Sequence, residues 1–528
     1  GGTIKLDGNY PVGTGNVALG DTALSSGSLS GTYNTAIGNG SLTSNTSGGA
    51  NTSVGGNSLD ANTTGNYNTG MGYFSLSENT TGSNSVGIGR DALRNNTTAS
   101  SNTAVGYQAA YANTTGGQVA AFGSNALMDN TTGDYNTALG FWALTNNTTA
   151  NSNTGVGHTA LSTNTTGASN TAVGHQALLS NTTASLNTAV GYQAAYSNTT
   201  ATGISAFGRK ALYSNTTGAY NAGLGFSCLA SNTTGTQNVA VGTYSLELNT
   251  TGGQNTSVGH QALLNNTTAS RNTSVGYQAG LANTTASFNT FLGYRAGYEN
   301  QTGDDCTYIG YRAGEDTTGQ DNTFIGASAG TLVTSGSNNT IIGKHNGNQG
   351  GLDIRTSSNN IVLSDGDGNP RLHINSGSVL THTVSVTSED TTQIFNNDNA
   401  SGAKFKLSFR QNGTQVGVIE VGTSSTSYNT SSDYRLKENV VELTGATDRL
   451  KQLNPSRFNF IADADTTVDG FIAHEVQSVV PEAITGTKDA VDADGNPEYQ
   501  GIDQSKLVPL LVATIQELEA RITALEGA

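Results

Sequence analysis

Apolar and polar positions in the long N-terminal part of the chain repeat with a period of 17 residues. Each period contains a Gly that is preceded by an apolar residue, and a small residue usually stands before that apolar residue. Seven residues after the Gly comes Asn, from Asn45 to Asn300, with Thr317 as the sole departure. The seventeen Gly residues in register stand at positions 38, 55, 72, 89, 106, 123, 140, 157, 174, 191, 208, 225, 242, 259, 276, 293 and 310. Such self-similarity is the signature of a repeat architecture.

The unit "NTAVGHQALLSNTTASL", residues 170–186, represents the repeat. Its segments "TAVG" and "HQAL" predict two short strands, separated by an "NTTA" turn and an Asn-led corner. One such unit cannot bury its apolar positions alone, but stacked units enclose a continuous narrow core. The fold class is therefore mostly β, with a parallel β-solenoid or β-roll over residues 16–345 that follows a lead-in at residues 1–15. Some twenty rungs at about 4.8 Å each would form a rod of roughly 95 Å, and stacked Asn and Thr should form hydrogen-bonded ladders.

The strict period ends near residue 345, and alternating patterns replace it in "NNIVLSD", "RLHINSG", "AKFKLSFRQNG" and "TQVGVIEVG". These segments predict short strands joined by turns such as "DGDGN" and "QNG". Asp365 and Asp367 resemble part of a calcium loop, but the remaining ligand spacing is absent, which favours hairpin turns. Residues 346–431 are therefore expected to form a β-rich neck or tip.

The composition changes at "SSDYRLKENV", residues 431–440: residues 1–430 hold 35 charged side chains, and the much shorter segment 431–528 holds 25. This shift marks a domain boundary. Beyond it the sequence predicts an α+β domain, residues 432–528, with helices in "GATDRLKQLNP" and "GFIAHEVQSVVPEAI", a strand in "SRFNFI" and a hairpin in "DAVDADGNPEYQGI". The last helix carries a coiled-coil seam, formed by Leu511, Ile515, Leu518, Ile522 and Leu525.

Charge and composition exclude several classes of protein. A net charge of -16 argues against a nucleic-acid partner, because phosphate binding needs a basic surface. No apolar run approaches the roughly 18 residues that predict a membrane span, so membrane insertion is not expected. The only cysteines, Cys228 and Cys306, lie about five rungs apart and cannot pair within one chain. No cofactor motif is present.

Two groups of residues could bind a ligand, but a structural role is the favoured interpretation for both. His158, His175 and His260 share a repeat position with Tyr107, Tyr192 and Tyr277, which favours an exposed or inter-chain face over a metal site. The same aromatic row could alternatively form a sugar-stacking surface. A second group of carboxylates could bind a hard cation, although a solvated corner is favoured; it comprises Asp304, Asp305, Glu315, Asp316 and Asp321. No metal site is therefore predicted.

The repeat motif "N-T-A-V-G-x-x-A" resembles the repeat of trimeric autotransporter adhesin heads and the fibre shafts of tailed phages. It departs from the adhesin heads in its 17-residue period, which is longer than theirs. The resemblance covers about residues 16–345. It implies a homotrimer of solenoids.

Three ordered motifs after the boundary resemble the intramolecular chaperone and autoprocessing domain of phage tail spikes and fibres, the S74 peptidase family. They are "SSDYRLKENV", "GFIAHEVQSVVPEAI" and "YQGIDQSKLVPLLVATIQELEARI". In that family the "S-D-x-R-L-K" motif carries a Ser/Lys dyad, which falls here on Ser432 and Lys437. The resemblance implies self-cleavage at the motif after trimeric assembly, followed by loss of the chaperone.

The chemistry of this pair agrees with that role. A Ser hydroxyl is a weak nucleophile that needs a base, and a Lys amine can serve when burial lowers its pKa from about 10.4. Residues five apart share no face of a strand or helix, so Ser432 and Lys437 need a turn to meet. We expect cleavage between Ser431 and Ser432, with a bond one residue away as the alternative. Asp433 and Arg435 are candidates for orienting the loop and are assigned no catalytic role.

The leading hypothesis is a homotrimeric tail fibre or spike of the virion, assembled in the host cytoplasm. Its expected partners are a host surface receptor, a glycan or an outer-membrane component, and other tail proteins at its N-terminal end. One alternative is a tailspike depolymerase, which would need paired carboxylates in a groove. Another is a bacterial trimeric surface adhesin. Apart from the single self-cleavage, the sequence predicts no enzymatic activity.

Overall fold

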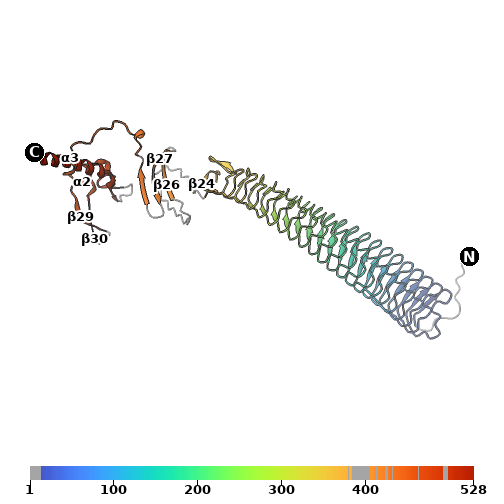
Figure 1. Cartoon of the computed structure of the whole chain (residues 1–528). Helices are drawn as coiled ribbons and strands as arrows, with labels where there is room; N and C mark the ends of the chain where they lie inside the picture. Colours follow the sequence, from blue (N-terminus) through green and yellow to red (C-terminus); the bar gives the residue numbers. More distant parts are fainter. Residues whose placement is uncertain are drawn as a thin grey trace. The chain divides into compact units, whose positions relative to one another are not determined.

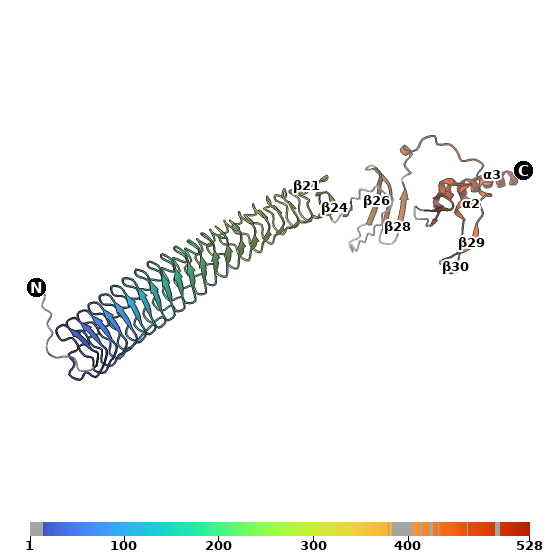
Figure 2. The same cartoon turned by 180° about the vertical axis from the view of Figure 1, so that it is seen from behind.

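The computed structural model describes residues 14–377, 380–382, 405–411, 414–421, 426–430, 432–461, 463–491 and 497–527. Two compact units divide the chain, Gly1–Ser388 and Glu389–Ala528. In the first unit, rungs stack one on the next along a single direction (Figures 1 and 2). The predicted parallel β-solenoid is therefore confirmed.

Each rung contributes one three-residue strand to a continuous parallel sheet. Neighbouring strands pair in register, as where Thr171, Ala172 and Val173 face Thr188, Ala189 and Val190. The strands are β1 (Val17–Leu19), β2 (Thr35–Ile37), β3 (Thr52–Val54), β4 (Thr69–Met71), β5 (Val86–Ile88), β6 (Thr103–Val105), β7 (Ala120–Phe122), β8 (Thr137–Leu139), β9 (Thr154–Val156), β10 (Thr171–Val173), β11 (Thr188–Val190), β12 (Ser205–Phe207), β13 (Ala222–Leu224), β14 (Val239–Val241), β15 (Thr256–Val258), β16 (Thr273–Val275), β17 (Thr290–Leu292), β18 (Thr307–Ile309), β19 (Thr323–Ile325) and β20 (Thr340–Ile342).

The prediction of a second strand in each unit was wrong. The "HQAL" segment and its equivalents form turns, because two of their residues, such as Gln176 (φ 57°) and Leu178 (φ 50°), adopt the left-handed conformation. The turns still bind the next rung, since the Leu178 N–H donates to the Ala194 carbonyl at 3.0 Å. Backbone pairing between rungs therefore continues on both sides of the core without a second sheet.

The repeat Gly stands where the chain leaves the strand. Gly174 has φ +136°, and a Cβ there would lie 2.3 Å from the carbonyl oxygen of Gly191 in the next rung. Both the dihedral angle and the close approach exclude a side chain. Inside the rung, Ala172 and Leu178 are fully buried, whereas Thr171 and Val173 face outward from the sheet.

Buried Asn side chains link each rung to the next, which confirms the predicted ladder. Asn181 Nδ2 donates to Asn164 Oδ1 at 2.8 Å and to the Ala184 carbonyl at 3.0 Å. Asn198 Nδ2 in turn donates to Asn181 Oδ1 at 3.0 Å. A Thr ladder runs beside it, in which Thr182 Oγ1 donates to the Thr199 carbonyl at 3.2 Å.

The rungs near the C-terminal end of the solenoid replace small inward residues with aromatic ones. Phe291, Tyr308 and Phe324 are fully buried and stack at 5.5 and 5.1 Å between ring centroids. The Leu position of the turn becomes Gly in the same region, at Gly280, Gly297, Gly314 and Gly330. A Cβ at Gly297 would lie 2.5 Å from the Phe291 ring, so the larger ring occupies the space of the missing Leu.

The first unit ends with strands outside the strict repeat. The "NNIVLSD" and "RLHINSG" strands are confirmed as β23 (Ile361–Ser364), which pairs in parallel with β20, and β24 (Pro370–Ile374), which pairs antiparallel with β23. The short strands β21 (Asn348–Gln349), β22 (Leu352–Asp353) and β25 (Leu380–His382) were not predicted. Asp365 closes the turn between β23 and β24 by accepting from the backbone N–H groups of Asp367 at 3.0 Å and Asn369 at 2.8 Å. That turn is therefore a hairpin turn, as expected.

The second unit opens with an antiparallel sheet of β26 (Phe405–Gln411), β27 (Thr414–Val421) and β28 (Thr426–Thr430). The first two strands match the predicted ones, and the "QNG" turn continues into residues 412–413, outside the described residues. The remaining elements are η1 (Tyr434–Leu436), α1 (Ala446–Leu450), β29 (Ser456–Phe460), β30 (Asp463–Gly470), α2 (Ala473–Gln477), η2 (Pro481–Ala483), β31 (Ile484–Thr485), β32 (Ala490–Val491), β33 (Pro497–Glu498), β34 (Gly501–Ile502), η3 (Gln504–Leu507) and α3 (Val508–Glu526).

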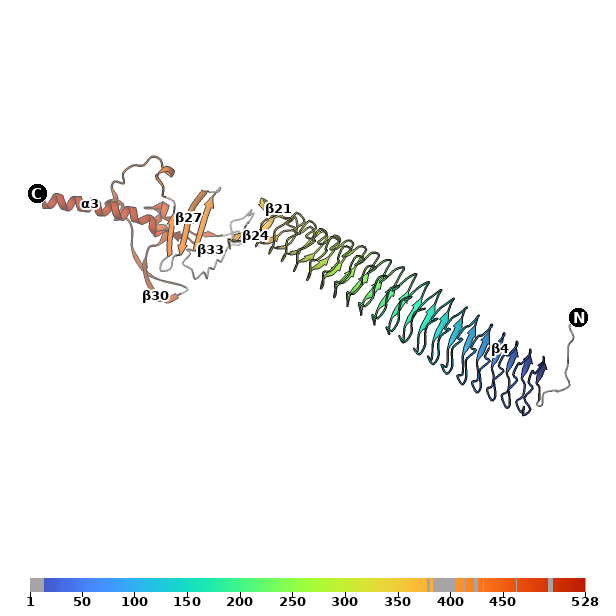
Figure 3. The ribbon, with the colours of Figure 1, turned by 45° about the vertical axis from the view of Figure 1, so that its right-hand side comes forward.

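The predicted strand at "SRFNFI" and the C-terminal helix are confirmed, and Figure 3 shows α3 along its length. The helix predicted in "GFIAHEVQSVVPEAI" is shorter than expected, because α2 ends before η2 begins at Pro481. Strands β32 and β33 pair as the predicted hairpin, while its turn at Asp494–Gly495 lies outside the described residues.

A small core with a carboxylate clamp holds this α+β part together. Ala446, Val480 and Leu510 are among its buried residues. Glu517 of α3 accepts hydrogen bonds from the backbone N–H groups of Ala446 and Thr447, both at 2.7 Å, at the start of α1. A hydrogen bond from the Thr447 hydroxyl, together with these two backbone bonds, lowers the pKa of Glu517 to about 2. The clamp anchors α1 against α3.

The Asn ladder yields a first prediction. Asn181→Ala should lower the free energy of unfolding, because each buried polar group left unpaired costs about 1–3 kcal/mol. Thr183→Ala is the control, since Thr183 is exposed in the same turn and should cost no more than about 0.5 kcal/mol. Urea unfolding of the two variants measures the difference. Equal stability of the two variants would contradict a structural role of the ladder.

The aromatic rungs yield a second prediction, in the form of a double-mutant cycle. Gly297→Leu alone should destabilise the solenoid because of the clash with Phe291, although Leu178 shows that this backbone position accepts Leu. Phe291→Ala alone should cost about 3–5 kcal/mol through the cavity it leaves. In the double variant the new Leu should partly fill that cavity. Additive free energies of unfolding for the two substitutions would contradict the proposed exchange of volume.

Candidate active site

One short turn forms the candidate site around Ser432. The 3-10 helix η1 covers Tyr434–Leu436, and Asp433 caps it by accepting a hydrogen bond from the Arg435 backbone N–H at 2.9 Å. Lys437 ends the helix, and its backbone N–H donates to the Tyr434 carbonyl at 3.1 Å. The turn reverses the chain between Ser432 and Lys437, as their spacing required.

The two predicted dyad residues meet across this turn. Lys437 Nζ donates a hydrogen bond to Ser432 Oγ at 2.8 Å, and both side chains are exposed. This distance permits proton transfer between hydroxyl and amine. Nucleophile and base in hydrogen-bond contact are the arrangement that covalent catalysis by Ser requires.

An ion pair braces the same turn. Arg435 Nε lies 2.9 Å from Asp433 Oδ1, and Arg435 Nη2 lies 2.7 Å from Asp433 Oδ2. The hydrogen bonds from the Arg435 side chain and backbone lower the pKa of Asp433. Asp433 and Arg435 therefore pair with each other inside the turn that follows Ser432, and their role in orienting the loop stays a prediction. The cap formed by Asp433 was not predicted from the sequence, although an Asp that bonds the backbone two residues ahead is typical of a tight turn.

The other candidate residues are placed as follows. Ser431, on the far side of the expected cleavage point, lies outside the described residues. His158, His175 and His260 are exposed in rows of stacked rings, in agreement with the exposed face expected for them. Cys228 and Cys306 are free and buried, and burial raises the pKa of Cys228 to about 12.

The carboxylates near the end of the solenoid do not gather into a site. Within the described part of the chain, no group of three or more His, Cys, Asp or Glu side chains could hold a metal ion. The interpretation as a solvated corner was wrong for Glu315, which is 2% exposed and pairs with Arg295 at 2.9 Å and with Arg312. Its burial is possible because two guanidinium groups balance its charge.

One comparison with known proteins found a similarity in this region. The model of the Peptidase S74 family, described as chaperone of endosialidase, matches residues 432–485. The match begins at Ser432 and includes Lys437, α1 and α2. No curated protein and no solved structure matches the chain. In the described residues, no helix is both long and apolar enough to cross a membrane.

The family match and the solenoid support each other. A match to this family model after a long β-solenoid of 17-residue repeats fits a phage tail fibre or tail spike. The hydrogen-bonded Ser432 and Lys437 stand at the first residues of the matched region.

The geometry of the pair predicts the outcome of two substitutions. We expect the wild-type chain to yield two fragments that meet at or next to Ser431–Ser432, and Ser432→Ala or Lys437→Gln to leave the chain whole. Removal of the nucleophile or the base should abolish the cut, because the two act as a unit. Denatured mass measurement gives the result directly.

Matched controls are Ser478→Ala and Lys451→Gln, which change the same residue types at exposed positions of the same domain. Both should be cut like the wild type. Intact wild-type chains in an assembled sample, or cut Ser432→Ala chains, would contradict the role of the dyad.

Proposed function

We propose that this protein is a homotrimeric fibre or spike of a phage tail that binds the host surface, and that it loses its C-terminal chaperone domain by one self-cleavage. The observation that carries the proposal is the order of the parts. A repetitive solenoid is followed by a domain whose family match begins at a hydrogen-bonded Ser/Lys pair.

The proposed cleavage uses only groups of this chain and one water molecule. Ser432 Oγ attacks the carbonyl carbon of Ser431 while the Lys437 amine takes the hydroxyl proton. The peptide bond breaks, an ester forms on Ser432 Oγ, and the proton passes to the released α-amine. Water then hydrolyses the ester, which leaves a carboxylate on Ser431 and restores the Ser432 hydroxyl.

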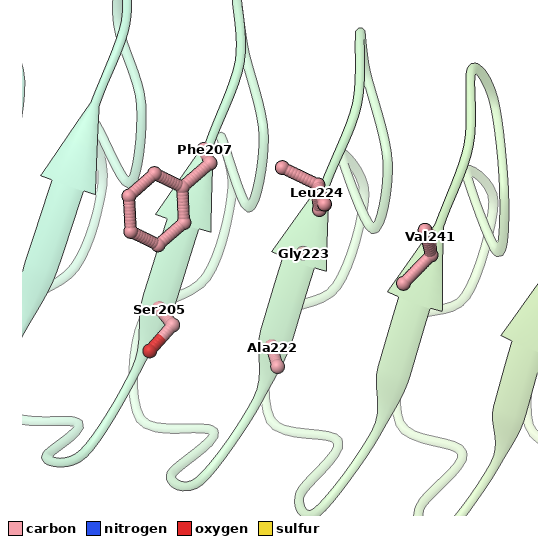
Figure 4. Close-up of a pocket in the computed structure, with 6 residues that line it drawn as sticks. All are labelled: Ser205, Phe207, Ala222, Gly223, Leu224 and Val241. Carbon is pink, nitrogen blue, oxygen red and sulfur yellow. The ribbon is translucent and has the colours of Figure 1, made fainter.

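An uncovered apolar row on the solenoid supports the trimer. The outward residue just before the repeat Gly is apolar from Leu19 to Ile342, and Leu139 and Leu224 are 49% and 54% exposed. Figure 4 shows Phe207, Leu224 and Val241 of this row on neighbouring strands, where they line a pocket. An exposed apolar surface of this extent marks an interaction site, and a second copy with the same spacing of rungs matches it along its length.

The C-terminal helix supports the trimer independently. In α3 the predicted seam is uncovered, with Ile515, Ile522 and Leu525 at 64%, 54% and 78% exposure. Seam residues of this kind bury themselves against equivalent helices of other chains. The chaperone domain therefore carries its own association surface.

The repeat explains why such a domain is useful. A shift of one chain by 17 residues against its partners would lose only one rung of contact, so wrong registers lie close in energy. A small domain that associates first would fix the starting register. Its removal afterwards would leave a kinetically stable rod.

Cysteine cross-linking tests the proposed assembly. Val173→Cys should form disulfides between chains under oxidation, because the outward row would bring equivalent positions together. Thr183→Cys, at an exposed turn position, should not. Sedimentation should give three times the chain mass of 53.9 kDa before cleavage. A monomeric mass, or cross-links at position 183 alone, would contradict the proposal.

A further inference from the structure

Three clusters of basic side chains lie along the solenoid, each against aromatic rings. Two of them contain their own carboxylate. Asp91, only 2% exposed, accepts from Arg90 and Arg94 at 3.1 Å each, and the Arg94 guanidinium lies 4.4 Å from the centre of the Phe74 ring. The cluster near the C-terminal end has the same design, with buried Glu315 between two Arg side chains. In both clusters each Arg pairs with a carboxylate of the chain, which offsets part of the positive charge.

The middle cluster has the same aromatic setting but lacks a carboxylate. The Arg209 guanidinium lies between the rings of Tyr192 and Phe226, at 5.8 and 5.2 Å from their centres. Beside it, Lys210 Nζ lies 5.2 Å from the centre of the Tyr213 ring. Across the part of the chain that the structure describes, the ion pairs involve neither cation.

The sequence on either side of this cluster contains no acidic residue that could pair with it. Residues 135–246 hold no Asp or Glu, and Arg209 and Lys210 are their only Lys or Arg, in a chain with a net charge of -16. The flanking carboxylates Asp134 and Glu247 lie about four and two rungs away, roughly 20 and 10 Å. The shorter distance, to Glu247, is about one Debye length at physiological salt. Salt therefore weakens the attraction between these carboxylates and Arg209.

Arg209 also continues a ladder of planar side chains. Phe141, His158, His175 and Tyr192 stack at 5.4, 5.1 and 5.3 Å between successive ring centroids. Because neighbouring rings cover each other's faces, the ring edges of this exposed row point to solvent. A sugar therefore cannot stack on a face inside the row, but its hydroxyl groups can hydrogen-bond to the His, Tyr and Arg edges, which follow one another along the rod.

We infer that the ladder Phe141–His158–His175–Tyr192–Arg209–Phe226 is a binding site for an acidic polysaccharide. Arg209 and Lys210 bind its carboxylate or phosphate group, since a guanidinium offers a fork of donors that matches either anion. The polymer lies along the edges of the ladder, and residues 135–246 contribute no carboxylate that would repel it. The inference rests on the proposed host-recognition function and names the class of its receptor.

Affinity electrophoresis of the full-length protein tests this site, in native gels that contain a defined polysaccharide. Polygalacturonate supplies carboxylates and its fully methyl-esterified form supplies the same backbone without charge, while phosphomannan and mannan form the equivalent pair for phosphate. Arg209→Gln is the test variant. Arg271→Gln is the matched control, because Arg271 also stacks on a ring, Phe288 at 5.2 Å, but lies outside the uncharged segment.

We expect an acidic polymer, but not its neutral counterpart, to retard the wild type and Arg271→Gln. Arg209→Gln should bind at least about tenfold more weakly, the effect of losing one charge-assisted hydrogen bond. Retardation by polygalacturonate alone or by phosphomannan alone identifies the anion. Absence of retardation by both acidic polymers, or equal retardation of the two variants, overturns the inference. Chain masses and cross-linking test the proposed function separately. A negative result in the electrophoresis would therefore overturn the polysaccharide site without affecting the test of the proposed function.

Discussion

The pairing of every rung with the next one is the constraint on which the solenoid depends. Backbone N–H groups on both sides of the core donate to the following rung, as from Thr171 to Asn187 and from Leu178 to Ala194. Such pairing requires rungs of nearly equal length, and it leaves no room for a side chain at the repeat Gly, where Gly174 meets Gly191. The 17-residue period of the sequence therefore follows from the hydrogen bonds that each rung makes with the next.

Departures from the repeat are tolerated where the chain compensates within the same or the neighbouring rung. Phe291 is larger than the small inward residue of most rungs. Gly280 and Gly297 stand on either side of it, at the turn position where other rungs have a Leu that would collide with the ring. Glu315 is a buried charge, and Arg295 and Arg312 neutralise it. Arg209 has no such compensation, which distinguishes it from the other Arg clusters of the solenoid.

Sequence periodicity predicted the solenoid and the neck strands, because these depend on spacing and on which face a residue occupies. The pairing of Ser432 with Lys437 was expected instead from the resemblance of "SSDYRLKENV" to the motif of the S74 family. Periodicity failed for the second segment of each rung, where left-handed residues such as Gln176 and Leu178 alternate with others and mimic the pattern of a strand. It also missed β30, whose segment "DADTTVDG" has no apolar period and is held by pairing with β29 and by the Arg457–Asp469 ion pair. The left-handed conformation of single residues and the pairing of a polar strand outside the repeat leave no trace in a pattern of polarity.

The exposure of the Ser432–Lys437 pair bears on the order of events in the proposed maturation. A Lys amine becomes an effective base when burial favours its neutral form, and an acyl intermediate needs a defined access of water. In the single chain both side chains are exposed. The apolar row of the solenoid and the seam of α3 are also uncovered, so association of chains would bury surface in both units. If a neighbouring chain covers the turn at Ser432, cleavage follows assembly without a separate signal, and a chain that fails to assemble keeps its chaperone.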